Sequence, residues 1–317
     1  MSEAVPLDAG RGELTEELLA GPPEFDEFWR ELHAQARAVD PGVRRVREIG
    51  REPGWRLSEV RFTSTAGIEL GAYLLEPDGG VERVVVGLSG YGGAHEPFDP
   101  LRRPGVAELS PAVRGMPALS EQPGIPDVAA EHVLHGIAAR ETYVIGGCVQ
   151  DAWVAITAAQ HLFPDARRVD LRGSSFGGGL GALALPWDDR VTAATLTVPT
   201  FGNHPARLRT PCTGSGESVR LLAQRDPSIV ETVRNFDAAT AAARVQVPVL
   251  VGAARVDPAV PPVGQFAVYE ALPGPKMLVE LTAGHLEFDG VERQRQTMHG
   301  ASLGWLDLHD AGYAAPR

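Results

Sequence analysis

The chain has 317 residues, 44% of them apolar and 22% charged, so it is long enough and apolar enough to bury a large core. Its formal net charge of −12 repels phosphate backbones and anionic lipid, which argues against binding to nucleic acid or to a membrane surface. The two cysteines, Cys148 and Cys212, belong to no CxxC or Cys/His cluster and are expected to be reduced thiols.

The N-terminal stretch MSEAVPLDAGRGELTEELL carries acidic residues where a secretory signal needs a basic start and an apolar run. No later stretch approaches the ~18 apolar residues of a membrane span, so we expect a cytoplasmic protein. The next segment, PEFDEFWRELHAQARAV, places Phe25, Phe28 and Trp29 on one face at helical spacing. Residues 1–40 are therefore predicted to form a helical extension.

Three short runs follow in which apolar and polar residues alternate: RRVREIG, WRLSEVRFTS and IELGAYLLEP. This period of two predicts antiparallel strands. The run RVVVGLSG (83–90) is continuously apolar and ends in glycine, which is typical of a strand buried on both faces. VAELSPAV (106–113) is predicted to be a further strand.

From residue 141 onward the chain alternates between helix and strand patterns. Helices are predicted at 141–163, 176–185, 261–272 and 291–309, and strands at 167–172, 191–199, 247–257 and 276–284. Such alternation indicates a parallel sheet with helices on both faces, an α/β fold in one domain over residues 1–317. Residues 200–243 have weaker strand character and predict a helical insertion, a lid over the site.

Ser175 stands inside the pattern G-x-S-x-G, in the stretch RGSSFGGGLGALA between a predicted strand and a predicted helix. This is the context of a nucleophile elbow, in which small residues two positions before and after the serine let strand and helix approach closely. Gly173 and Gly177 meet that need. A packing turn with an incidental serine is the alternative that the pattern alone leaves open.

Two residues downstream turn the elbow into a candidate catalytic triad. Asp257 follows the predicted strand at 247–257, and His285 follows the strand at 276–284. The order Ser, acid, His is that of α/β-hydrolases, and the carboxyl ends of parallel strands meet along one edge of the sheet. Alone, Asp257 also fits a turn before Pro258, and His285 a surface histidine. Together they predict Ser175 as nucleophile, His285 as base and Asp257 as the acid that orients it.

Ester chemistry also needs two N–H donors for the tetrahedral oxyanion. One is expected from Phe176, the residue after the nucleophile, and the other from Tyr91 in the glycine-rich loop LSGYGGAHEPFD (88–99). A glycine-rich turn without a catalytic part is the alternative for this loop. Tyr91 and Phe176, with Arg114 and Phe201, are also the candidate substrate-binding residues.

Several other residues are functional candidates, but their patterns give weaker evidence for a site. His132 and His135 lack a third ligand, so a metal site is not expected there. Asp151, inside the long predicted helix, is expected to support a neighbouring loop, and Arg114 to shape the floor of the pocket. GGGLG lacks the register of a dinucleotide-binding loop.

Several motifs, in the same order along the chain, resemble the acetyl xylan esterase / cephalosporin-C deacetylase family, a carbohydrate esterase family 7-like branch of the α/β-hydrolases. FDEFW is similar to its N-terminal helix, SGYGG to its H-G-Y-G-G loop and RGM to its R-G-Q motif. GIAARETYVIGGCVQDAW resembles its G-I-x-x-x-x-T-Y-Y-Y-R-G-x-x-x-D-A segment, and GSSFGGGL its G-G-S-Q-G-G-G-L elbow. VPVLVGAARVDPAVPP and AGHLEF are similar to its acid and histidine regions.

The resemblance implies an α/β-hydrolase fold, the triad Ser175, Asp257 and His285, and an oxyanion hole at Tyr91 and Phe176. It also implies removal of acetyl groups from short xylooligosaccharides or cephalosporin C, no metal or other cofactor, and a homo-oligomer, commonly a hexamer.

The chain departs from the family around the nucleophile. Ser89 replaces a histidine and Phe176 a glutamine, and further changes lie at Met116–Pro117, Gly146–Gly147 and Leu286–Glu287. A kept triad with altered surroundings favours the same attack on a different acyl or alcohol part. We therefore expect a serine esterase that removes a small acyl group, acetyl, from a sugar or secondary-metabolite ester. An acyltransferase or tailoring hydrolase on the same triad is the alternative, followed by a non-catalytic binding protein of this fold.

Overall fold

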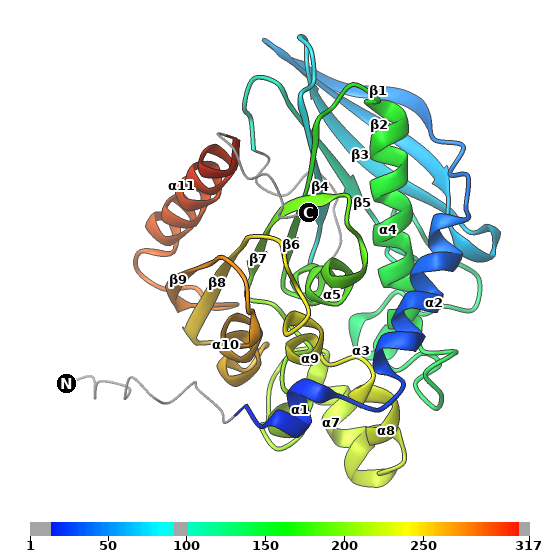
Figure 1. The fold of residues 1–317 in the computed structure, drawn as a ribbon, viewed down its shortest axis with the longest axis vertical. Coiled ribbons are helices and arrows are strands. Elements are labelled where there is room, and N and C mark those ends of the chain that lie inside the picture. The colour runs from blue at the N-terminus through cyan, green and yellow to red at the C-terminus, as the bar shows by residue number, and fades with distance from the viewer. Residues whose placement is uncertain (1–13, 92–100, 311–317) are drawn as a thin grey trace.

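The computed structural model describes residues 14–91 and 101–310 of the chain. Its centre is one nine-stranded sheet with the strand order β1-β2-β3-β5-β4-β6-β7-β8-β9 (Figure 1). The strands are β1 (Arg44–Glu52), β2 (Trp55–Thr63), β3 (Glu69–Pro77), β4 (Arg83–Leu88), β5 (Val106–Pro111), β6 (Arg168–Ser174), β7 (Val191–Thr197), β8 (Val249–Val256) and β9 (Lys276–Ala283).

The two halves of the sheet differ in direction as their sequence patterns predict. β1, β2 and β3 pair antiparallel, and β3 pairs antiparallel with β5. From β5 through β4, β6, β7 and β8 to β9 every pairing is parallel. The apolar run of β4 is buried at five of its six positions. The carboxyl ends of β4, β6, β8 and β9 therefore lie along one edge, where α/β folds place their binding sites.

Helices cover both faces of the sheet, which confirms the predicted fold class. α4 (Val144–Leu162), α5 (Phe176–Ala184) and α10 (Pro262–Ala271) pack on one face, and α11 (Val291–Asp310) packs on the other. The period of two in β8 explains this division. Val249 and Val251 belong to the main core, whereas Leu250 between them packs with Met298 and Trp305 of α11.

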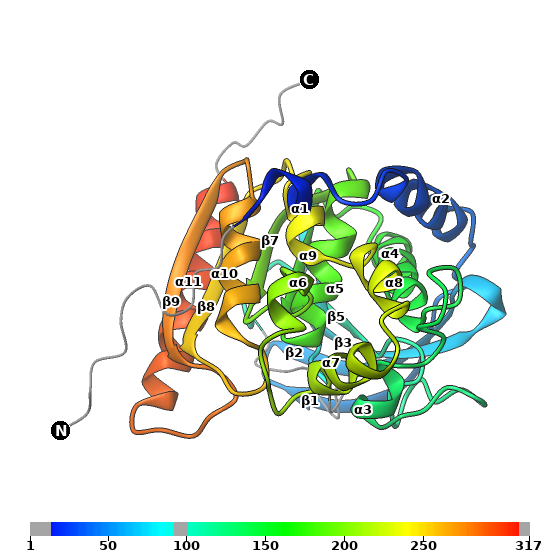
Figure 2. The ribbon, with the colours of Figure 1, turned by 90° about the horizontal axis from the view of Figure 1, so that it is seen from below.

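The segment between β7 and β8 is helical, with α6 (His204–Arg207), α7 (Gly216–Arg225), α8 (Ile229–Arg234) and α9 (Ala238–Ala242). At the N-terminus lie α1 (Glu16–Ala20) and α2 (Phe25–Arg37), and α3 (Ala129–His132) precedes α4. Figure 2 shows α1 beside α9 and α2 beside α4. Trp29 of α2 donates a hydrogen bond from Nε1 to the carbonyl of Asn235, 2.9 Å away, which ties the N-terminal helices to the insertion.

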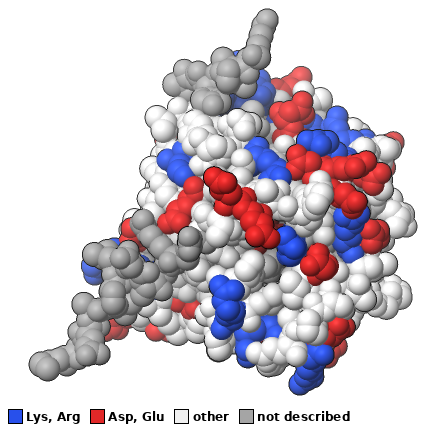
Figure 3. Space-filling model, turned by 60° about the horizontal axis from the view of Figure 1, so that its bottom comes forward, with Lys and Arg blue, Asp and Glu red and all other residues white. Residues whose placement is uncertain are grey.

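Charges of both signs are interspersed on the face of the molecule in Figure 3, without a broad area of basic side chains. Within the described residues, no helix has the length and apolar character needed to cross a membrane.

Candidate active site

Ser175 sits on a sharp turn between β6 and α5. Its backbone has φ 53° and ψ −112°, a conformation that L residues rarely adopt and that is held by the packing around it. A Cβ at Gly173 would lie 2.3 Å from the carbonyl oxygen of Gly177, and a Cβ at Gly177 would lie 2.1 Å from that of Leu88. Both positions of the G-x-S-x-G pattern therefore require glycine, because any side chain would push the strand and the helix apart.

His285 lies within hydrogen-bond distance of both other residues of the predicted triad. His285 Nε2 is 3.0 Å from Ser175 Oγ, and His285 Nδ1 is 2.8 Å from Asp257 Oδ2. The loops after β6, β8 and β9 bring them together at the carboxyl edge of the sheet. The His285 side chain is 32% exposed whereas that of Asp257 is 0% exposed, so solvent reaches the base but not the acid.

The carboxylate of Asp257 accepts four hydrogen bonds. Oδ1 accepts hydrogen bonds from the backbone N–H groups of Ala259 and Val260, both at 2.9 Å. Oδ2 accepts from His285 Nδ1 and from Gln265 Nε2 at 2.9 Å. Because a carboxylate only accepts, Nδ1 carries the imidazole proton and Nε2 is left to accept from the serine hydroxyl. Nothing in the sequence singled out Gln265, which lies on α10 and is fully buried.

The two predicted oxyanion donors flank the nucleophile. Phe176 is the first residue of α5, so its N–H has no acceptor within the helix and lies at the positive end of the helix dipole. A Cβ at Gly90 would lie 3.3 Å from Ser175 Cβ, which shows that the backbone leading into Tyr91 passes directly against the serine. The remainder of the predicted loop, 92–99, lies outside the described residues.

The side chains of these two residues stack on each other. The rings of Tyr91 and Phe176 are 4.0 Å apart between centroids at an interplanar angle of 17°. Phe201 meets Phe176 edge-on at 6.0 Å. Phe176 is 1% exposed and Phe201 3%, so both are buried beneath the nucleophile, and their contact with substrate stays a prediction.

The side chain of Arg114 is largely buried. Its Nε and Nη2 contact the two carboxylate oxygens of Asp151 at 3.0 and 2.7 Å, and Nη2 also donates to Thr65 Oγ1 at 2.8 Å. A Cβ at Gly147 would lie 2.4 Å from Arg114 Nη1, so a glycine there makes room for the guanidinium. The guanidinium of Arg114 is thus engaged by side chains inside the protein, and its contact with substrate stays a prediction.

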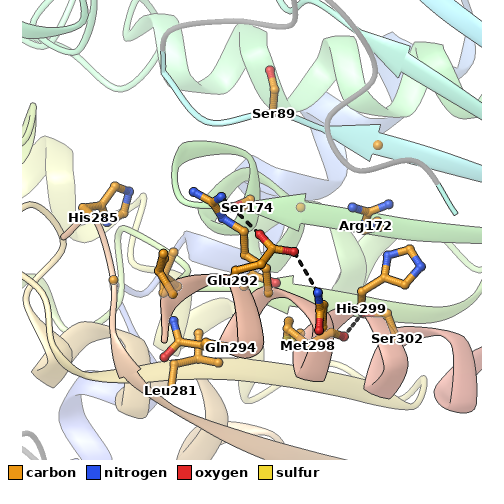
Figure 4. Close-up of a pocket in the computed structure, with 18 of the residues that line it drawn as sticks. Ser89, Arg172, Ser174, Leu281, His285, Glu292, Gln294, Met298, His299 and Ser302 are labelled. Atoms are coloured by element: carbon orange, nitrogen blue, oxygen red, sulfur yellow. Dashed lines mark hydrogen bonds and ion pairs between the residues drawn. The ribbon is translucent and has the colours of Figure 1, made fainter. Parts of the chain in front are cut away.

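A cavity of about 920 Å³ lies between the sheet and α11, and one end of it reaches His285 (Figure 4). Arg172 and His299 lie on the other side of the view, with Glu292 between. Ser175 is not among the residues that line it, although Ser174 is. The cavity therefore lies beside the base and not in front of the nucleophile. Within the described residues, no cluster of three or more His, Cys, Asp or Glu side chains is arranged to hold a metal ion.

Comparison with known proteins settles the family. The model of the family described as Acetyl xylan esterase (AXE1) matches residues 15–299. The chain belongs to the acetyl xylan esterase family. This confirms the predicted family resemblance, and the protein is a serine esterase, a carboxylic ester hydrolase.

Solved structures agree on the fold of this esterase. It is similar to an acetyl xylan esterase from Paenibacillus sp. R4, at 22% identity and a TM-score of 0.77 over 94% of this chain and 99% of that one. Acetyl xylan esterase 1 from Thermoanaerobacterium sp. JW/SL YS485 matches at 19% identity and a TM-score of 0.72, over 90% and 98% of the two chains. An acylaminoacyl peptidase from Pyrococcus horikoshii matches at 18% identity and a TM-score of 0.65, over 83% of this chain and 43% of that one.

Proposed function

We propose that this esterase removes a small acyl group, acetyl, from an ester of a sugar or a secondary metabolite, with Ser175, His285 and Asp257 as its catalytic triad. The observation that carries the proposal is the hydrogen-bonded series Ser175 Oγ to His285 Nε2 at 3.0 Å and His285 Nδ1 to Asp257 Oδ2 at 2.8 Å. A serine hydroxyl is a weak nucleophile near neutral pH, and an adjacent oriented base makes it reactive.

In the acylation step, Ser175 Oγ attacks the ester carbonyl while His285 Nε2 takes the hydroxyl proton. Asp257 stays ionised and stabilises the imidazolium that forms. The carbonyl oxygen becomes an oxyanion, which the N–H groups of Tyr91 and Phe176 bind. His285 then gives its proton to the leaving alcohol, and the acyl group remains on the serine.

Water completes the cycle by the same route. His285 removes a proton from a water molecule, which attacks the acyl-enzyme, and the oxyanion forms again at the same two amides. Collapse of this intermediate releases the carboxylic acid and returns the proton to Ser175. Every step uses protein groups and water, so the proposed reaction needs no cofactor.

The finer expectations remain predictions of this proposal. The departures from the family motifs at Ser89, Phe176 and Met116 favour a substrate other than acetylated xylan, with cephalosporin C as one candidate class. A cytoplasmic location and a homo-oligomer, as large as a hexamer, stay predictions from the sequence, as does the role of residues 200–243 as a lid.

Hydrolysis of p-nitrophenyl acetate tests the proposal. Ser175→Ala is expected to lower turnover by roughly 10⁴- to 10⁶-fold, because without the nucleophile only catalysis by the oxyanion hole and by substrate binding remains. Ser174→Ala is the matched control, since it removes the neighbouring hydroxyl and leaves the triad in place. Equal rates for the wild type and Ser175→Ala would overturn the assignment.

A further inference from the structure

Tyr91 has a second hydrogen-bonded partner that the proposed mechanism does not use. Its hydroxyl lies 2.9 Å from Nδ1 of His132, which comes from α3. The two rings also meet edge-on, with centroids 5.5 Å apart, and His132 meets the edge of Phe176 at 6.0 Å. One buried histidine therefore contacts both residues whose amides are proposed to bind the oxyanion.

The direction of these hydrogen bonds follows from the other side of the ring. His132 Nε2 lies 3.0 Å from the backbone carbonyl of Arg114, which accepts only. Nε2 therefore carries the proton. Burial lowers the pKa of His132 and favours the neutral ring, which leaves Nδ1 as an acceptor for the hydroxyl proton of Tyr91.

The carbonyl that anchors His132 is itself held in place. The N–H of Arg114 donates to Asp151 Oδ2 at 2.8 Å, in addition to the paired contacts of the guanidinium. Asp151 is fully buried and accepts a further hydrogen bond from Ser64 Oγ at 2.5 Å. Gly115 has φ 79°, and a Cβ there would lie 2.8 Å from His132 Cδ2, so glycine lets the ring approach. His132 is thus fixed to the core rather than to a movable surface.

We propose that His132 is a positioning residue, which holds the Tyr91 side chain so that the Tyr91 N–H points at the oxyanion. The inference rests on the proposed function, because it presupposes the role of that amide. The physical reason is that Gly90, just before Tyr91, gives the backbone no side chain of its own to fix it. The phenol of Tyr91 is held by a stack on one side and a hydrogen bond at its tip, and together these restrict the amide. An oxyanion donor contributes only when it is held in place before the reaction.

Two single variants and their double variant test this with p-nitrophenyl acetate. Tyr91→Phe removes one oxygen and keeps the stack on Phe176, and His132→Phe keeps a ring and removes both hydrogen bonds. Each is expected to lower kcat roughly 10- to 100-fold with KM nearly unchanged, since an oxyanion forms only in the transition state. The double variant is expected to be no slower than the slower single variant, because both remove the same interaction.

Affinity for a boronic acid that adds to Ser175 provides a second readout, which loss of stability alone would not move in a folded variant. It is expected to fall by the same factor as kcat, because the adduct resembles the tetrahedral intermediate. Tyr73→Phe, which changes a half-buried tyrosine on β3, is the matched control and is expected to retain wild-type kinetics. If His132→Phe fails to fold, Tyr91→Phe carries the test.

The outcomes separate this inference from the proposed function. An active wild type with an unchanged kcat in Tyr91→Phe would overturn the positioning role and leave the triad standing. Losses in the two single variants that multiply in the double variant would also overturn it, since the two residues would then act independently. A wild type that neither hydrolyses the ester nor reacts with a fluorophosphonate would overturn the proposed function itself.

Discussion

Gln265 donates a hydrogen bond to the same carboxylate oxygen of Asp257 that accepts from His285, at 2.9 Å against 2.8 Å. Its Nε2 also donates to the carbonyl of Val260 at 2.7 Å, and its Oε1 accepts from the N–H of Ala254 at 2.8 Å. One amide therefore joins the end of β8, the loop that carries the acid, and the first turn of α10. The acid is held in place by a residue that takes no part in the proton transfer.

Replacement of this amide is expected to weaken both stability and turnover. Gln265→Leu keeps the size of the side chain but leaves the N–H of Ala254 and the carbonyl of Val260 buried without partners, at about 1–3 kcal/mol each. We expect the free energy of unfolding to fall by about 2–6 kcal/mol and kcat by roughly 10-fold, as Asp257 loses a hydrogen bond that fixes its position. Urea denaturation and ester hydrolysis measure the two effects. Gln160→Leu, on the half-buried side of α4, is the control, and a Gln265→Leu enzyme with wild-type kcat would contradict the role.

The elbow glycines are expected to tolerate no side chain. Gly177→Ala places a methyl group 2.1 Å from the carbonyl oxygen of Leu88, so strand and helix must separate. We expect a loss of roughly 3 kcal/mol in unfolding free energy and loss of activity. Gly300→Ala is the contrast, because a Cβ there meets nothing within 4 Å and the site lies inside α11, so stability is expected to rise by up to about 1 kcal/mol. Thermal unfolding measures the melting temperatures of the two variants. Equal changes in melting temperature would contradict the difference expected between the two positions.

Acid is expected to destabilise the fold through His204, a buried residue of the insertion. Burial, with a smaller effect of the Arg207 charge, lowers the pKa of His204 to about 3. The ordinary pKa of histidine is about 6.5, so between these values the unfolded chain binds a proton that the folded chain does not. Stability is therefore complete above the unfolded pKa and is lost as the pH falls below it, by about 2 kcal/mol from pH 7 to pH 5.

Urea denaturation at the two pH values measures this loss, to which the lowered pKa of His132 adds in the same direction. His204→Gln keeps a donor for the carbonyl of Phe236, which His204 Nε2 meets at 3.2 Å, and has no proton to take up. Its loss between pH 7 and pH 5 is expected to be smaller than that of the wild type by about 2 kcal/mol. The same change at the exposed His161 is the control. A His204→Gln protein with the wild-type pH dependence would contradict the assignment.

Two buried arginines are expected to respond in opposite ways to removal of their charge. Arg114 forms an ion pair with the fully buried Asp151. Arg114→Met leaves that carboxylate buried without its partner, so it is expected to lower the free energy of unfolding by about 3–5 kcal/mol. Arg207 is in no ion pair within the described part of the chain, its buried Nε lacks a hydrogen-bond partner, and its guanidinium lies 5.9 Å from the centroid of the Phe201 ring. Arg207→Met is therefore expected to be neutral or stabilising. Chemical denaturation measures the free energy of unfolding of both variants. A larger loss of stability in Arg207→Met than in Arg114→Met would contradict this expectation.

Local patterns were sufficient to predict the elements and to choose the candidate site residues. The alternation in 55–77 and the apolar run of 83–90 reflect how many faces each strand buries, and burial of a strand follows a period of two along the chain. Ser175, Asp257 and His285 could be predicted for the same reason, since each directly follows a strand and parallel strands end at a common edge. In such cases the position of a residue in its own element already fixes its place in the fold.

The hydrogen bonds that His132 and Gln265 make to Tyr91 and Asp257 could not be predicted from such patterns. In the sequence, His132 and His135 stand out only as two possible metal ligands that lack a third. In the structure, His132 accepts a hydrogen bond from Tyr91, 41 positions away in the chain. In the sequence, Gln265 is one polar residue in the predicted helix 261–272, and no motif marks it.

The sequence by itself thus determined the fold class, the family and the choice of the candidate triad residues, because these depend on periodicity and on motifs that are contiguous in the chain. Only the tertiary structure decided which side chains contact the carboxylate of Asp257 and the phenol of Tyr91. The reason is that the partners of a buried polar group are set by packing between distant segments, and no local pattern records the distance between Tyr91 and His132.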